Sequence, residues 1–197
     1  KRITMISRSL SLIAILAALF LAGPAHSQNQ AAARVWQRVD QIPPNRPASD
    51  FWVRPTVFRA FTLDHAALKG VLARVPKETA QPVALSQTDI SLPMPDGSLA
   101  RFRIAESPVM APELAAKFPE IKTYSGQGID DPVASVRFDT TPAGFHAQIL
   151  SPHGAVYIDP QFRGDTNLYA CYFKRDYRRT AEAFQCFTPT GDTLGLL

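Results

Sequence analysis

Tight turns that combine proline with glycine divide the middle of this chain into short apolar segments. Pro95-Asp96-Gly97 joins one pair of segments, and turns at residues 141–144 and 151–154 repeat the Pro-then-Gly order. In such turns proline presets φ, aspartate hydrogen-bonds locally and glycine accepts a positive φ. Short segments between turns are more typical of β-rich folds than of helical bundles, so their regular spacing predicts antiparallel strands.

The predicted fold class is α+β, mainly an antiparallel β-sheet made of a hairpin plus a meander. The hairpin pairs strands at 83–92 and 99–106, and in the second strand Phe102 and Ile104 share one face. Alternation of this kind indicates a sheet with one buried and one solvated side. The other predicted strands cover residues 54–62, 133–139, 145–150, 155–158 and 168–174. Residues 121–132 are interpreted as a short strand that runs into a glycine-rich bend.

One main helix and a second short helix complete the prediction. Apolar residues recur at helical spacing from Leu63 to Val75, Asp64 can cap the first turn, and Pro76 ends the pattern. Pro112 begins the short helix, which extends to Phe118, because proline is favoured in a first helical turn.

Residues 1–27 are predicted to be a secretory signal peptide. They have a basic start, an apolar run at 10–22, and small residues at Ala25 and Ser27 before the expected cleavage point. The apolar run of about 13 residues is too short to span a bilayer core of about 30 Å. We therefore expect export to a secreted or periplasmic location, with no stable membrane anchor after signal cleavage.

The remaining chain divides into three predicted parts. Residues 28–50 are polar and proline-rich and are expected to be a flexible linker, 51–180 an α+β domain, and 181–197 a C-terminal tail. The signal segment holds three basic and no acidic residues, which leaves 18 basic and 17 acidic side chains. This balance argues against nucleic acid as a partner.

No catalytic motif occurs in the chain. The sequence lacks H-E-x-x-H, G-x-S-x-G and G-x-x-x-x-G-K-[ST], and no two of its four histidines have the spacing of zinc ligands. We expect no catalytic residue and no intrinsic metal or cofactor. Whether the chain belongs to an enzyme is left open by its residues.

Several segments together resemble a known family. FRAFTLDHAALKGVL, LPMPDG, ESPVM, FPEIKTYSGQGIDDP and YIDP are similar to the N-terminal pro-region of bacterial secreted reprolysin-like (adamalysin-type) zinc metalloprotease precursors. The resemblance covers roughly residues 55–180. It implies a prodomain that acts as intramolecular inhibitor and folding aid, with a metalloprotease catalytic domain in cis as its partner.

The resemblance implies that zinc is bound by a catalytic domain and not by the pro-region. The catalytic domain of that family carries H-E-x-x-H-x-x-G-x-x-H, which this chain lacks. The tail at 181–197 would lead to that domain, and the full precursor would be a zinc metalloendopeptidase. The alternative is a free-standing exported β-rich module that recognises a peptide or an envelope component.

The two cysteines, Cys171 and Cys186, have three open interpretations. In an oxidising compartment they would form a disulfide. The resemblance implies instead that Cys186 is a zinc-blocking thiol, because family pro-regions can place a free cysteine on the catalytic zinc; Phe187 follows it where glycine is more usual. Both residues could also be plain thiols, with Cys171 buried.

A basic run at 174–179 precedes the predicted tail. It contains Arg175, Arg178 and Arg179. Such runs are commonly solvated faces, but exposed basic segments are also easily cut by processing proteases. The run is therefore a candidate processing region.

Overall fold

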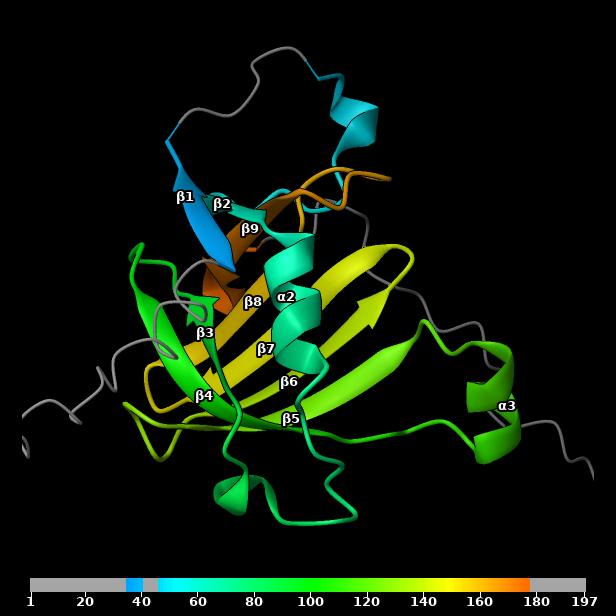
Figure 1. The fold of residues 1–197 in the computed structure, drawn as a ribbon. Coiled ribbons are helices and arrows are strands. Elements are labelled where there is room, and N and C mark those ends of the chain that lie inside the picture. The colour runs from blue at the N-terminus through cyan, green and yellow to red at the C-terminus, as the bar shows by residue number, and fades with distance from the viewer. Residues whose placement is uncertain (1–34, 41–45, 178–197) are drawn as a thin grey trace, which may run out of the picture.

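A single antiparallel sheet forms the body of the molecule. The computed structural model describes residues 35–40 and 46–177. In this part of the chain nine strands follow the order β1-β2-β9-β8-β7-β6-β5-β4-β3 (Figure 1). Their bounds are β1 (Trp36–Val39), β2 (Arg59–Leu63), β3 (Asp89–Pro93), β4 (Leu99–Glu106), β5 (Lys122–Gly128), β6 (Ser135–Thr141), β7 (Gly144–Ser151), β8 (Gly154–Pro160) and β9 (Leu168–Phe173).

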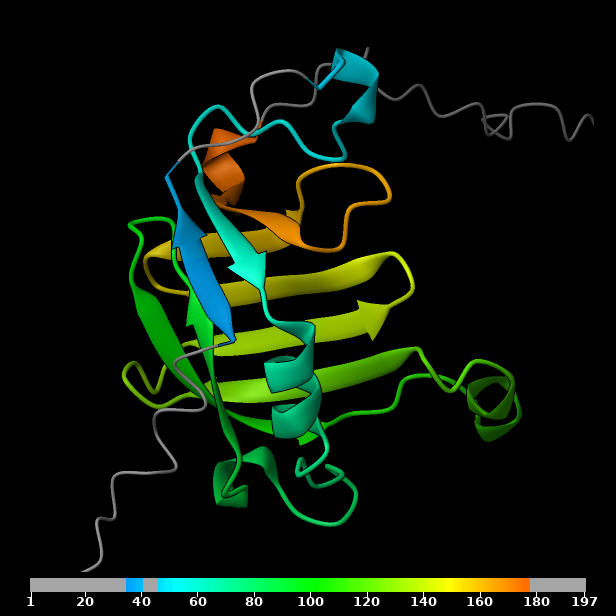
Figure 2. The same ribbon diagram turned by 45° about the horizontal axis from the view of Figure 1, so that its top comes forward.

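The described helices are α2 (His65–Leu72) and α3 (Pro112–Lys117), with single turns of 3₁₀-helix at Ala48–Asp50, Val83–Leu85 and Lys174–Asp176. Asp64 caps α2 as predicted, because its Oδ1 accepts a hydrogen bond of 2.9 Å from the Ala67 amide. Leu68 and Val71 then face the core, so α2 packs against the inside of the curved sheet (Figure 2). α3 instead projects from the sheet (Figure 1).

The sheet is barrel-like. Strands β3 to β9 each pair with the next one along the chain, β2 then pairs with β9, and β1 with β2. The two edge strands, β1 and β3, approach each other as the sheet curls (Figure 2). The prediction of a mainly antiparallel sheet with one main and one short helix is confirmed, but the arrangement as a hairpin plus a meander is wrong. The hairpin strand β4 also pairs with β5, so hairpin and meander are one continuous sheet.

A column of aromatic rings fills the inside of this sheet. Tyr124 stacks on Phe138 with centroids 4.7 Å apart, and Phe138 stacks on Phe145 at 5.2 Å. Trp36 meets the edges of Phe145 at 5.2 Å and Tyr169 at 5.1 Å. Pairs of this geometry stabilise a core beyond their buried area. The five rings come from β5, β6, β7, β1 and β9, so the column connects opposite sides of the sheet.

Three local expectations need correction. Residues 28–50 were expected to be a flexible linker, yet β1 and the turn at Ala48–Asp50 lie within them. β1 is ordered because Trp36 enters the aromatic column. The first hairpin strand begins at Asp89, since Val83–Leu85 forms a 3₁₀ turn after Pro82. Likewise, only Arg59–Leu63 of the predicted strand at 54–62 is extended within the sheet.

The prediction of a glycine-rich bend is also wrong, because Gly126 and Gly128 belong to strand β5. A side chain at Gly126 would place its Cβ 2.5 Å from Val136 Cγ1. Glycine is needed here for the close approach of two strands, not for a turn.

We expect Tyr169→Phe to lower the free energy of unfolding by about 1–3 kcal/mol. The Tyr169 hydroxyl accepts a hydrogen bond from the buried Phe145 amide at 3.1 Å and donates to the Thr166 carbonyl at 2.8 Å. Urea titration monitored by fluorescence measures the change. Tyr177→Phe is the control, because its ring is 41% exposed and the change should stay within about 0.5 kcal/mol. Equal effects of the two changes would contradict the structural role of the Tyr169 hydroxyl.

Candidate functional site

The outward side of β6, β7 and β8 carries a groove with a volume of about 620 Å³. We call it the outer groove and define it by the side chains Arg137, Asp139, His146, Gln148, Tyr157 and Asp159. Because side chains alternate along a strand, these residues face away from the core residues Phe145, Ala147 and Ile149. The register sets His146 opposite Asp139, and Gln148 opposite Tyr157.

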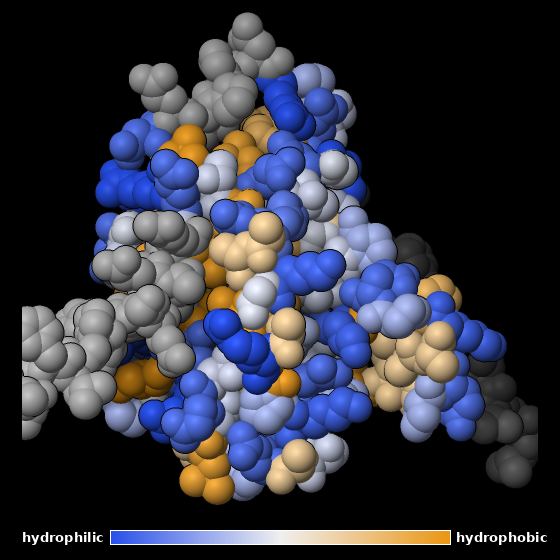
Figure 3. Space-filling model, viewed as in Figure 1, coloured by the Kyte–Doolittle hydropathy of each residue, from blue (hydrophilic) through white to orange (hydrophobic). Residues whose placement is uncertain are grey.

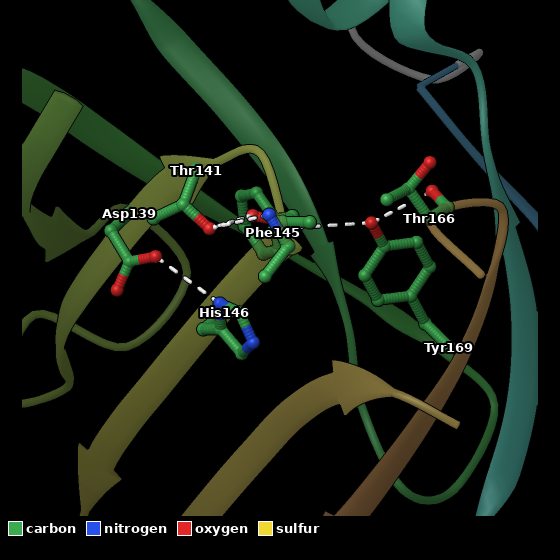
Figure 4. A network of polar contacts seen from close by, with 8 residues as sticks. Asp139, Thr141, Phe145, His146, Thr166 and Tyr169 are labelled. Carbon is green, nitrogen blue, oxygen red and sulfur yellow. Dashed lines mark hydrogen bonds and ion pairs between the residues drawn. The ribbon is translucent and has the colours of Figure 1, made fainter. Parts of the chain in front are cut away.

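Side-chain hydrogen bonds order the outer groove. His146 Nδ1 lies 3.2 Å from Asp139 Oδ1 (Figure 4). Gln148 Nε2 donates to the Tyr157 hydroxyl at 2.8 Å. At the β9 side of the groove, the Tyr172 hydroxyl donates to Asp159 Oδ2 at 2.7 Å.

The β6–β7 turn holds His146 in place. The Ala143 amide donates to Thr141 Oγ1 at 3.1 Å, and Gly144 has a φ of 123°. Next in the chain, the Phe145 amide donates to the Tyr169 hydroxyl (Figure 4). Hydrogen bonds within and just after the β6–β7 turn therefore fix the backbone next to His146.

Two groups in the outer groove have pKa values that are raised above their ordinary values. The hydrogen bond to Asp139 raises the pKa of His146 above its ordinary value of 6.5, against the opposing effect of burial. Burial raises the pKa of Asp159, although the hydrogen bond from Tyr172 and the charge of His146 act in the opposite direction. Each carboxylate thus interacts with the imidazole, but only Asp139 contacts it.

A second hollow, of about 740 Å³, lies where the β3–β4 turn, the β5–β6 loop and the β7–β8 turn come together. We call it the end cavity. Phe102, Ile149 and Phe173 contribute apolar surface to it. At its rim Arg101 Nη2 lies 2.6 Å from Asp130 Oδ1, and the hydrogen bonds from Arg101 lower the pKa of Asp130. The neighbouring Asp131 accepts from the Val133 amide at 3.1 Å, which is local turn chemistry.

Beside the outer groove, residues 107–121 form an arm that includes α3 and projects from the sheet (Figure 1). Val109 is 74% exposed, and Leu114 and Phe118 are 46% and 43% exposed. Apolar side chains gather on this lobe of the surface (Figure 3). Val109 lines both the outer groove and a smaller hollow of about 300 Å³ beneath the arm. The arm and the outer groove therefore form one continuous surface.

The predicted cysteine site is described only in part. Cys171 is fully buried in β9, and its thiol donates to the Pro93 carbonyl at 3.2 Å. Burial raises the pKa of this thiol above its ordinary value. Cys186 lies outside the described residues, so the disulfide and the zinc-blocking thiol both stay predictions.

The predicted processing region is also described only in part. Arg175 lies in the 3₁₀ turn after β9, with its guanidinium 3.8 Å from the centroid of the Phe173 ring. Arg178 and Arg179 lie outside the described residues.

Within 35–40 and 46–177, no group of three or more histidine, cysteine or acidic side chains is placed to hold a metal ion. In the same ranges no helix is both long and apolar enough to cross a membrane.

The sequence analysis did not single out the outer groove. A usable signal was present, since polar side chains at 146 and 148 and at 157 and 159 alternate with apolar ones on two neighbouring strands. That alternation indicates a solvated face but not which residues on it meet. Comparison with known proteins adds no assignment, because no family model, curated protein or solved structure matches the chain.

We expect Asp139→Asn to lower the pKa of His146, because the carboxylate that favours the imidazolium is removed. A raised folded-state pKa stabilises the native state fully below pH 6.5, and the contribution is lost as pH rises through the folded-state value. For this partly exposed pair, with side chains 25% and 35% exposed, the loss on substitution should be about 0.5 kcal/mol at pH 5.5 and near zero at pH 8. NMR titration and urea unfolding at both pH values measure these effects. An unchanged His146 titration would contradict the pair.

We expect Cys171 to resist alkylation in the native chain and to react with iodoacetamide in urea, because its thiol is buried and hydrogen-bonded. Mass mapping of tryptic peptides measures the modification without any reductant. If Cys171 stays unmodified in urea until reductant is added, a disulfide holds it.

Proposed function

We propose that this chain is the non-catalytic pro-region of a secreted zinc metalloprotease precursor, acting as inhibitor and folding aid for the catalytic domain. The proposal starts from the resemblance of its segments to such pro-regions. Those segments are not scattered: LPMPDG and Ile129-Asp130-Asp131-Pro132 reach the end cavity, whereas ESPVM and Tyr157-Ile158-Asp159-Pro160 reach the outer groove and the arm.

The arm is the observation that carries the proposal. An inhibitory pro-region has to offer its protease a surface, and contiguous exposed apolar side chains are typical of a protein-binding site. Val109, Leu114 and Phe118 provide such a surface on a segment that projects away from the core. Polar groups of the outer groove border it, which matches the apolar centre and polar rim of protein interfaces.

A second function is favoured by the end cavity. Its volume of about 740 Å³ lies within the range of about 300–1,000 Å³ that is typical of ligand sites. Apolar lining with a polar rim suits an extended peptide or a small amphipathic molecule. An exported module that recognises a peptide or an envelope component would use this hollow rather than the arm.

The test is inhibition in trans. The chain is titrated against each reprolysin-like catalytic domain encoded in the same genome, with cleavage of a fluorogenic peptide as the measurement. We expect one of these domains to be inhibited, and the V109S/F118S variant to bind it at least about thirtyfold more weakly, because truncated apolar contacts at an interface centre cost more than about 1 kcal/mol each.

V57S/V133S is the matched control, since Val57 and Val133 are 57% and 71% exposed but lie away from the arm. It should inhibit like the wild type. Failure of the wild-type chain to inhibit any of the enzymes would reject the pro-region function. Inhibition that V109S/F118S leaves unchanged would reject only the arm as the docking surface.

A further inference from the structure

The last described residue, Tyr177, lies one aromatic ring away from the outer groove. The Tyr177 ring packs on Tyr172 with centroids 5.8 Å apart, and Tyr172 stacks on Tyr157 at 5.9 Å. Thr56 fixes the backbone just before Tyr177, because its amide and hydroxyl both donate to the Asp176 carbonyl, at 2.8 and 2.9 Å. Tyr177 therefore ends a row of three tyrosines that leads to the groove.

A carboxylate without an ion-pair partner lies along this row. Asp159 accepts the Tyr172 hydroxyl at 2.7 Å, yet none of the described cations lies within ion-pair distance of it. Its side chain is half-buried, and a buried carboxylate is costly unless it is paired. The other charges that face the groove are Asp139, His146 and Arg137. Arg137 donates to Ser107 Oγ at 3.0 Å on the arm side, and His146 contacts Asp139.

We propose that the outer groove binds the guanidinium groups of Arg178 and Arg179, the two residues that follow Tyr177 in the sequence. Arginine suits this site because its planar group both pairs with carboxylates and stacks on aromatic faces. Asp159 supplies the carboxylate and Tyr157 the aromatic face.

The distances allow this contact. Asp159 on β8 lies diagonally across from Tyr172 on β9, since Asp159 pairs with Ala170 and Tyr172 with Tyr157, and the Tyr172 hydroxyl still reaches the Asp159 carboxylate. Tyr177 packs on Tyr172, whose hydroxyl contacts the Asp159 carboxylate, so only the Tyr172 ring separates the last described residue from that carboxylate.

Binding would shield the basic run. A protease must take its target segment into its own active site in an accessible form, so arginines held by the groove are cut more slowly than free ones. The outer groove would then set the rate at which the candidate processing region is cleaved. This inference does not rest on the pro-region function.

Limited trypsin digestion of the full chain provides the first test, with cleavage after Arg178 and Arg179 followed by mass spectrometry. We expect D139N/D159N to increase the rate of cleavage at these two sites by about threefold to tenfold, as the loss of half-buried ion pairs implies. Asparagine keeps the acceptor for the Tyr172 hydroxyl. Cleavage after the exposed Arg74 reports any general loosening, and E120Q on the arm is the matched control for loss of an exposed carboxylate.

NMR titration of His146 is the reciprocal test. Removal of two nearby cations favours the imidazolium, so R178Q/R179Q should raise the pKa of His146. R74Q is the control for loss of a remote cation. Unchanged trypsin rates in D139N/D159N together with an unchanged His146 titration in R178Q/R179Q would overturn the proposal. A rate increase at Arg74 equal to that at Arg178 would also overturn it.

Discussion

The aromatic column is the contact on which the rest of the structure depends. A twisted antiparallel sheet can stay open or curl, and here five rings from strands far apart in the sequence meet inside it. Trp36 anchors β1 in this core. β1 pairs with β2, and it also lies near β3, so the two edges of the sheet approach each other. Tyr169 adds a polar link, because its hydroxyl joins the amide of β7 to the loop before β9. The curl in turn creates the two surfaces, a hollow at one end and a groove on the outside.

Local chemistry was predictable from the sequence, and long-range pairing was not. The cap at Asp64, the turn at Asp96 and Gly97, and the faces of Phe102 and Ile104 follow from patterns within a few residues, and the structure agrees with each. The pairing of β2 with β9 joins Ala60 to Ala170, and no local pattern specifies such a partner. Residues 28–50 were expected to be a flexible linker for the same reason, because their polar, proline-rich composition does not show that distant strands bury the Trp36 ring.

The same distinction explains why the outer groove went unnoticed. His146 and Asp139 are opposite each other only because the β6–β7 turn is tight, and Asp159 joins them only through the β7–β8 register. A one-residue change of register would send these side chains to the other face. The predicted sites, by contrast, were sets of one kind of residue, and one of the two cysteines and two of the three arginines lie outside the described residues.

The charges of the outer groove connect the two proposals. Asp139 and Asp159 face the same groove as Arg137 and His146, so the net charge of this surface depends on whether the imidazole carries a proton. Because its pKa is raised, His146 keeps that proton to a higher pH than a free histidine does. Each step toward acid therefore adds positive charge beside the carboxylate proposed to hold Arg178 and Arg179. On this proposal acidification weakens the attraction of the groove for the two arginines, whereas the exposed apolar side chains Val109, Leu114 and Phe118 of the arm do not titrate.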